Sequence, residues 1–163
     1  MTDLVFYTNP RSRGRIVRWM LEETGETYRT EIVEYGEAMK SPAYLAINPM
    51  GKIPALQDDD QVITETAAIC AYLADKFPEK GMAPAIDSNQ RGVYYRYLFV
   101  PGTTLEPMFS VNTMENAEYS AQSMGWGDWQ RCIATIEAMT PESGWALGEK
   151  FTAADIVYGG TLD

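Results

Sequence analysis

The chain has 163 residues, of which 45% are hydrophobic and 22% charged, a composition typical of one folded domain or of two small ones. Acidic residues outnumber basic residues by 23 to 13, and the net charge of −10 argues against nucleic acids and anionic membrane surfaces as partners. Histidine does not occur, which excludes histidine metal sites and histidine-based catalytic triads.

The first half of the chain alternates between strand and helix patterns. Short apolar or alternating runs predict strands, and longer runs with a helical period predict helices. In chain order, the sequence predicts a strand at 4–7, a helix at 12–25, a strand at 28–33, a short helix near 42–45, strands at 53–57 and 61–64, and a helix at 66–77. Residues 1–77 are therefore expected to form a β-α-β-α-β-β-α domain.

The rest of the chain carries helix patterns only. Residues 78–88 are rich in proline and glycine and predict a linker. Helical periods then cover 89–99 and roughly 117–138, and Pro101-Gly102 is expected to interrupt the first of these helices. Residues 89–163 are therefore predicted to form an all-helical domain.

A helix-start signature stands near the C terminus. Thr152 is expected to be the N-cap, with Asp155 at the third helical position and Phe151 packing onto Ile156. A capping box with such an apolar contact is typical of a helix that packs against others. Only eight residues, 156–163, follow the signature, so the helical bundle is expected to be truncated at its C terminus.

The segment Asn-Pro-Met-Gly-Lys-Ile-Pro-Ala-Leu at 48–56 leads into a predicted strand. Proline loses no ladder hydrogen bond when it occupies the first position of a strand. If the Ile53–Pro54 bond is cis, the N–H and C=O groups of Ile53 both face outward and can pair with an extended peptide. Because cis bonds are uncommon even before proline, an ordinary strand start is the alternative.

A second motif, Thr-Glu-Thr-Ala-Ala-Ile at 64–69, joins the end of a strand directly to the start of a helix. The backbone N–H groups of that helix start and the Thr66 hydroxyl would attract an anion, and Glu65 would attract an ammonium group. Such a pair suits the zwitterionic end of an amino acid. The alternative is that Glu65 or Thr66 only caps the helix.

A third segment, 7–15, places hydroxyl groups at the end of the first strand and at the start of the first helix. Four arginines crowd into this region, namely Arg11, Arg13, Arg15 and Arg18. Cations near a helix N-terminus each cost about 0.3–1 kcal/mol at exposed sites, so neighbouring acidic residues or a bound anion must offset them.

Together these motifs resemble those of the cytosolic glutathione transferase family. The segment at 48–56 resembles the family's Asn-Pro-x-Gly-x-(Val/Ile)-Pro-x-Leu signature, and residues 65–69 resemble its Glu-Ser-x-Ala-Ile signature. Residues 151–156 resemble the capping box that opens the sixth helix of the family's helical domain. The resemblance implies an α/β thioredoxin-like, glutathione-binding domain at 1–77 and an all-α domain at 89–163 that is an incomplete helical bundle.

The resemblance also implies roles for single residues in binding glutathione. Ile53 would pair main chain to main chain with the cysteinyl part, beside a cis Pro54. Glu65 and Thr66 would hold the γ-glutamyl end, and Lys52 would lie near the glycyl carboxylate.

The catalytic group is implied to lie just after the first strand. Ser12 best matches the serine of serine-type members, and Tyr7 is the alternative because it falls where tyrosine-type members carry their tyrosine. The alignment here needs a gap of about one residue, so Arg11 and Arg13 compete with Ser12 for that structural position. Arg11 is also expected among the glutathione-binding residues. A hydroxyl that donates a hydrogen bond to sulfur favours the thiolate, which would then attack an electrophilic carbon.

The second substrate is implied to be a small apolar electrophile that binds between the two domains. Tyr95, Phe99, Met108 and Phe109 are the candidate pocket residues, and the alternative for them is helix-bundle core. The implied activity is glutathione conjugation by a homodimer that uses no metal. The alternative is a binding or structural relative that keeps the fold without the chemistry.

A cytoplasmic location is expected. No apolar run approaches the roughly 20 residues of a membrane span, and the first residues lack the basic flank and apolar core of a signal peptide. The two cysteines, Cys70 and Cys132, lie far apart in the sequence, which fits a reducing compartment without disulfides.

Overall fold

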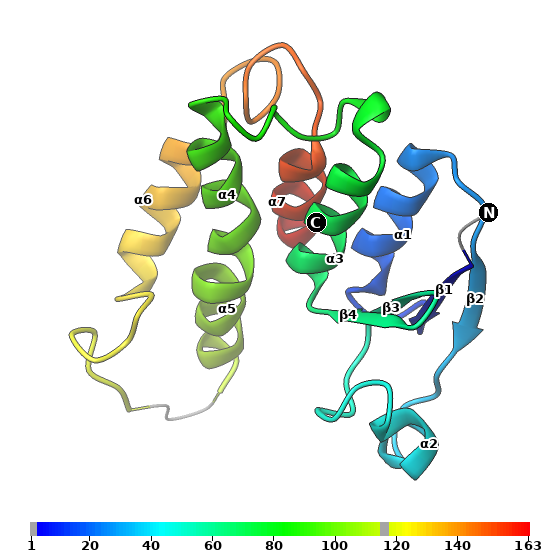
Figure 1. The fold of residues 1–163 in the computed structure, drawn as a ribbon. Coiled ribbons are helices and arrows are strands. Elements are labelled where there is room, and N and C mark those ends of the chain that lie inside the picture. The colour runs from blue at the N-terminus through cyan, green and yellow to red at the C-terminus, as the bar shows by residue number, and fades with distance from the viewer. Residues whose placement is uncertain (1–2, 115–117) are drawn as a thin grey trace. The chain divides into compact units, whose positions relative to one another are not determined.

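The computed structural model describes residues 3–114 and 118–163, and the chain falls into two compact units, Met1–Lys80 and Gly81–Asp163 (Figure 1). The first unit contains a four-stranded sheet with helices, and the second consists of helices. Within the described residues, the helices are too short or too polar to cross a membrane.

The first unit has the predicted order of strands and helices. Its elements are β1 (Leu4–Thr8), α1 (Gly14–Thr24), β2 (Arg29–Ile32), a 3-10 helix at Ala38–Lys40, α2 (Pro42–Leu45), β3 (Ala55–Asp58), β4 (Gln61–Thr64), α3 (Thr66–Lys76) and a 3-10 helix at Pro78–Lys80. The sheet order is β2-β1-β3-β4, with β1 parallel to β2 and β3 antiparallel to both of its neighbours. The expected α/β fold is confirmed.

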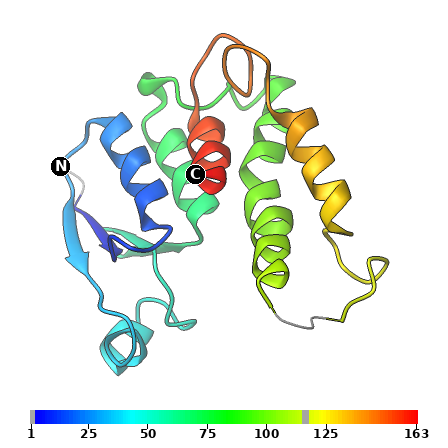
Figure 2. The same ribbon diagram turned by 180° about the vertical axis from the view of Figure 1, so that it is seen from behind.

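Alternation of side chains along β1 builds a core on each face of the sheet. Phe6 is fully buried, and the Arg18 guanidinium of α1 lies over its ring, 5.8 Å from the centroid. The next residue, Tyr7, points to the opposite face and packs against a second cluster, made by Val33, Met39 and Tyr44. Accordingly, α1 and α3 lie side by side on one face of the sheet, and α2 lies on the other (Figures 1 and 2).

The end of α1 follows the prediction. Gly25 has a φ of 67°, a left-handed conformation that glycine adopts without a steric penalty, and its N–H donates to the Glu22 carbonyl. The helix therefore stops where the sequence places its only glycine after Gly14 in this segment.

A buried ion pair joins the end of β3 to α3. The Asp58 carboxylate, which is 4% exposed, accepts hydrogen bonds from the Lys76 ammonium and the Tyr72 hydroxyl. Burial alone would raise the pKa of Asp58, but the hydrogen bonds from Lys76 and Tyr72 outweigh it and hold that pKa below its usual range. The last turn of α3 is thereby fixed to the sheet.

The second unit departs from the sequence prediction at Pro101-Gly102. Its elements are α4 (Gln90–Val100), a π-helical turn at Pro101–Leu105, α5 (Glu106–Asn112), α6 (Trp129–Met139) and α7 (Ala153–Leu162). The expected interruption was wrong, because the helical path runs on from α4 through the π turn into α5. Proline lacks an N–H group, and the backbone passes this position as a π-helical turn, in which the Thr103 hydroxyl donates to the Phe99 carbonyl at 2.8 Å.

The helix predicted at 117–138 was too long at its start. Residues 115–117 lie outside the described residues, and α6 begins only at Trp129. Gly127 adopts a φ of 78°, which a helix cannot continue, and Asp128 then caps α6 by accepting a hydrogen bond from the Arg131 N–H at 2.9 Å.

The capping box at the start of α7 is confirmed. The Thr152 hydroxyl oxygen accepts from the Ala154 N–H at 3.3 Å, and the Asp155 carboxylate accepts from the Thr152 N–H at 2.8 Å. The same carboxylate accepts from the Ala146 N–H at 2.6 Å, so it also fixes the preceding loop.

Replacing Lys76 with Met is expected to lower the free energy of unfolding by roughly 3 kcal/mol at pH 7, because a buried carboxylate loses its cation. The folded-state pKa of Asp58 lies below its ordinary value of 3.8, so the pair's contribution is full above that value and is lost as the pH falls through the folded-state pKa. The difference between Lys76→Met and wild type in urea denaturation should therefore shrink in strong acid.

The matched control is Lys80→Met, which removes a partly exposed ion pair with Glu26 at 3.2 Å. It should cost no more than about 1 kcal/mol. Equal losses for the two variants, or a loss for Lys76→Met that does not change with pH, would contradict the role given to Asp58.

Candidate functional site

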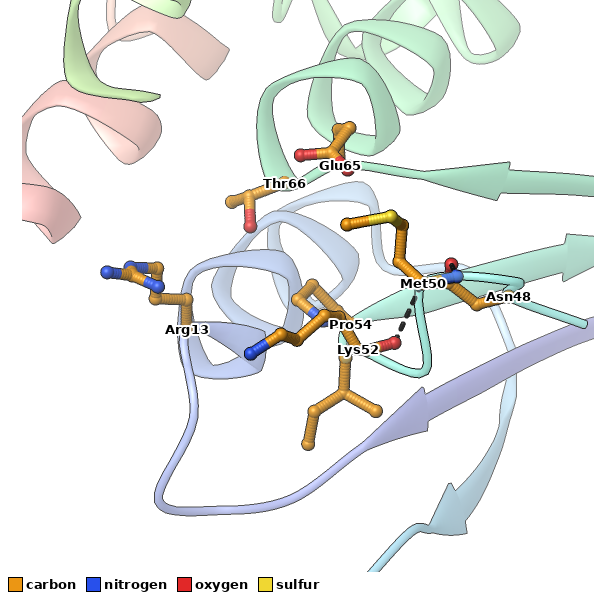
Figure 3. A pocket seen from close by; sticks show the side chains of 8 residues that line it. Arg13, Asn48, Met50, Lys52, Pro54, Glu65 and Thr66 are labelled. Atoms are coloured by element: carbon orange, nitrogen blue, oxygen red, sulfur yellow. Dashed lines mark hydrogen bonds between the residues drawn. The ribbon is translucent and has the colours of Figure 1, made fainter. Parts of the chain in front are cut away.

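A pocket of about 320 Å³ lies in the first unit, where the loop that leads into β3 meets the start of α3 (Figure 3). Three segments that are distant in the sequence contribute to it: the start of α1, the loop at 48–54, and the junction of β4 with α3. The lining residues are Arg13, Asn48, Met50, Lys52, Ile53, Pro54, Glu65 and Thr66.

The loop at 48–54 forms one wall, and a side chain of the loop itself holds its backbone. The Asn48 amide nitrogen donates to the Lys52 carbonyl at 2.7 Å, and the Asn48 amide oxygen accepts from the Met50 N–H at 3.1 Å (Figure 3). The Ile53–Pro54 bond that ends the loop is cis, as the resemblance implies. The backbone of this wall is therefore held by hydrogen bonds within the loop.

The junction of β4 with α3 forms the facing wall. Glu65 has a φ of 69° and a ψ of 122°, which is rare for a residue other than glycine and costs about 1–3 kcal/mol. Such conformations persist where the surrounding structure imposes them, often at functional sites. Thr66 is the first residue of α3, and Figure 3 shows its hydroxyl pointing toward the interior of the pocket.

Charges of both signs line the pocket. Arg13 and Lys52 bring cations, Glu65 brings a carboxylate, and the start of α3 adds the partial positive charge of a helix N-terminus. The pocket is thus rich in positive charge within a chain whose net charge is −10. This arrangement suits a ligand that carries an ammonium group and an excess of carboxylates.

Five of the six residues predicted to bind glutathione lie together in this pocket: Lys52, Ile53, Pro54, Glu65 and Thr66. The sixth, Arg11, does not line it, and its guanidinium lies over the Tyr35 ring, 5.7 Å from the centroid. Arg13, two residues later, does line the pocket. The contacts of these residues with a ligand stay predictions.

Ser12 directly precedes the pocket residue Arg13 without itself lining the pocket. The Ser12 hydroxyl donates to the Asn9 carbonyl at 2.7 Å and accepts from the Gly14 N–H at 3.0 Å. Its oxygen thus lies at the start of α1, where the helix N-terminus favours negative charge.

Tyr7, the alternative catalytic residue, is not a lining residue either. Its hydroxyl donates to the Gln57 side-chain oxygen at 2.9 Å, and its ring packs against Tyr44 with ring centroids 6.1 Å apart. The Tyr7 hydroxyl is therefore already hydrogen-bonded to a side chain of the neighbouring strand β3.

The candidate second-substrate residues divide into two groups within the second unit. Tyr95 and Phe99 stack on an exposed face of α4, with ring centroids 6.0 Å apart. Met108 is buried in a cluster between α5 and α6, and Phe109 packs against that cluster. A shared pocket for the four residues stays a prediction.

Sequence reasoning did not assign Asn48 and Met50 to the pocket, although both stand inside the motif at 48–56. The motif could have indicated them, but binding roles within it were assigned only to Lys52, Ile53 and Pro54. Among the described residues, acidic and cysteine side chains do not gather into a group of three that could hold a metal ion.

Comparison with known proteins gives concordant matches. Residues 12–76 match the family described as Glutathione S-transferase, N-terminal domain. The chain is 27% identical over 164 residues to the maleylacetoacetate isomerase of Pseudomonas aeruginosa, a match that covers 92% of this chain and 76% of that protein.

Two solved structures extend the match. One is a glutathione transferase from Methylococcus capsulatus, with 28% identity, a TM-score of 0.80, and coverage of 98% of this chain and 80% of that chain. The other is a glutathione transferase family member from Pseudomonas fluorescens with two glutathione bound, with 26% identity, a TM-score of 0.78, and coverage of 98% and 75%.

Gly51 offers a test of how tightly the loop is packed. It has a φ of 57°, and a Cβ placed there would lie 2.7 Å from the Met39 carbonyl oxygen. The Lys40 ammonium donates to the carbonyls of Met50 and Gly51 at 3.3 and 3.1 Å, so the loop has little room to move. Gly51→Ala is expected to destabilise the chain by more than about 1 kcal/mol in urea denaturation.

The control is Gly36→Ala, because Gly36 has a φ of 90° but nothing within 4 Å of the added Cβ. This control shares the conformational penalty and lacks the clash. If the two variants lose the same stability, the tight packing of the loop against Met39 is refuted.

Proposed function

We propose that this chain is a member of the cytosolic glutathione S-transferase family, and that it binds glutathione and joins its thiolate to small apolar electrophiles. The homodimer and the cytoplasmic location that the resemblance implies are part of this proposal.

The charge pattern of the pocket carries the proposal. Glutathione has two carboxylates and one ammonium group, and the pocket presents two cations, Arg13 and Lys52, and one carboxylate, Glu65. The Pseudomonas fluorescens structure, similar over nearly the whole chain, holds glutathione. Complementary charge within one pocket supports glutathione more specifically than the fold does.

We assign each part of the tripeptide to one wall. The ammonium and carboxylate of the γ-glutamyl end fit Glu65 and Thr66 at the start of α3, where the N–H groups of the helix favour an anion. The cysteinyl part fits the main chain of Ile53, and the glycyl carboxylate fits Lys52. Arg13 adds a second cation to the lining of the pocket.

Ser12 is the proposed catalytic residue. A rotation about its Cα–Cβ bond would turn its hydroxyl from the Asn9 carbonyl toward a bound sulfur, to which it would donate its hydrogen bond. That hydrogen bond, together with the N-terminus of α1 and the cation of Arg13, lowers the pKa of a thiol from about 8.5. Bound glutathione supplies the nucleophile, whose sulfur forms a bond to an electrophilic carbon as the leaving group departs with its electron pair.

Isomerisation of a small organic anion is a second candidate, favoured by the match to the Pseudomonas aeruginosa isomerase over 92% of this chain. Glutathione is consumed in transfer and recovered in isomerisation, so measuring its concentration during turnover separates the two. A chain that binds glutathione and turns over neither class of substrate would be the non-catalytic relative.

The variants Ser12→Ala and Tyr7→Phe test the choice of catalytic hydroxyl. Ser12→Ala is expected to lower kcat with an aryl halide by about a hundredfold, the effect of losing one donor to a developing anion, while the Kd for glutathione changes little. Tyr7→Phe serves as the matched control, because its hydroxyl is engaged by Gln57, and it should retain most of the activity.

Steady-state kinetics give kcat, and isothermal titration gives the Kd for glutathione. A large loss of kcat in Tyr7→Phe with near-normal activity in Ser12→Ala would reverse the assignment.

A further inference from the structure

The Lys52 carbonyl oxygen accepts two hydrogen bonds, one from the lining residue Asn48 and one from Tyr44, which does not line the pocket. The Tyr44 hydroxyl and the Asn48 amide nitrogen each donate to it at 2.7 Å. These donors belong to residues that are only 5% and 4% exposed, whereas Lys52 is exposed. The carbonyl is therefore turned inward and held there by two buried groups.

The direction of this carbonyl determines the direction of the next N–H group. A trans peptide group is planar, and its C=O and N–H bonds point in opposite directions. Fixing the Lys52 oxygen toward Tyr44 and Asn48 therefore turns the Ile53 N–H away from both of them. Ile53 and Asn48 line the pocket, whereas Tyr44 does not, so the Ile53 N–H points away from the donor that lies outside the pocket.

Tyr44 is itself held in place. Its ring belongs to the buried cluster with Val33 and Met39, and its N–H donates to the hydroxyl oxygen of Ser41, which caps α2. Burial raises the pKa of Tyr44 to about 12, so the hydroxyl keeps its proton at neutral pH and remains a donor.

We propose that Tyr44 is a positioning residue for glutathione, because its hydroxyl orients the peptide group between Lys52 and Ile53 and so presets the Ile53 main chain for pairing with the cysteinyl part. This inference rests on the proposed function. It gives α2 a role in ligand binding although α2 contributes no lining residue. Presetting a binding group raises affinity because less conformational freedom is lost on binding.

The variant Tyr44→Phe tests this role, since phenylalanine keeps the ring in the cluster and removes only the hydroxyl. In the ligand-free chain, the 13C shift of the Lys52 carbonyl and the 15N and 1H shifts of the Ile53 amide are expected to change. The Kd for glutathione, measured by isothermal titration, is expected to rise about fivefold, the factor for one lost hydrogen bond.

Tyr28→Phe is the matched control. It removes a hydroxyl that donates to Glu22 at 2.6 Å outside the pocket, so it should change neither the shifts of Lys52 and Ile53 nor the Kd.

Unchanged shifts at Lys52 and Ile53 in Tyr44→Phe, or changed shifts with an unchanged Kd, would overturn the positioning role. A wild-type chain that does not bind glutathione would overturn the proposed function and this role together. The two failures are distinguishable, because the shifts report on the peptide group without any ligand.

Discussion

The two hydrogen bonds to the Lys52 carbonyl are the constraint on which the pocket depends. They join the buried cluster behind α2 to the loop that forms the pocket wall, so packing on the far face of the sheet determines which backbone groups face the ligand. Neither donor lies at a chain end or in an exposed loop tip, and both are almost completely buried. Main-chain binding groups need such support. If the peptide groups of the loop could rotate freely, ordering them on binding would cost free energy and weaken the affinity for the ligand.

The facing wall depends on a second constraint at the opposite end of α3. Thr66 begins this helix beside the pocket, and Lys76 ends it with an ion pair to Asp58 on β3. The sheet therefore holds α3 at its last turn, while its first turn and the preceding residue Glu65 border the pocket. Strain at Glu65 is tolerable because elements on both sides of it are fixed. Structural and binding roles are thus divided between the two ends of one helix.

Most of this site could be predicted from the sequence, because its residues stand in two short motifs whose order along the chain is specific. Tyr44 could not, since its only signal was a short helix and its acceptor is a main-chain atom eight residues away. That Arg13 lines the pocket and Arg11 does not could not be predicted either. It depends on the turn after β1, which Asn9 shapes by accepting from the Arg11 N–H and donating to the Val33 carbonyl. In the second unit, the sequence predicted a break at Pro101, but the helical path continues through a π turn there.

The Ile53 main chain and the start of α3 are proposed to form one glutathione site. A glutathione titration followed by 15N–1H correlation spectra tests this proposal most directly. The account predicts saturable shifts of the Ile53 and Thr66 amides with a single shared Kd, whereas the amide of Val62, exposed on β4, stays unchanged. Shifts that leave Ile53 and Thr66 unmoved, or that follow two different affinities, would contradict it.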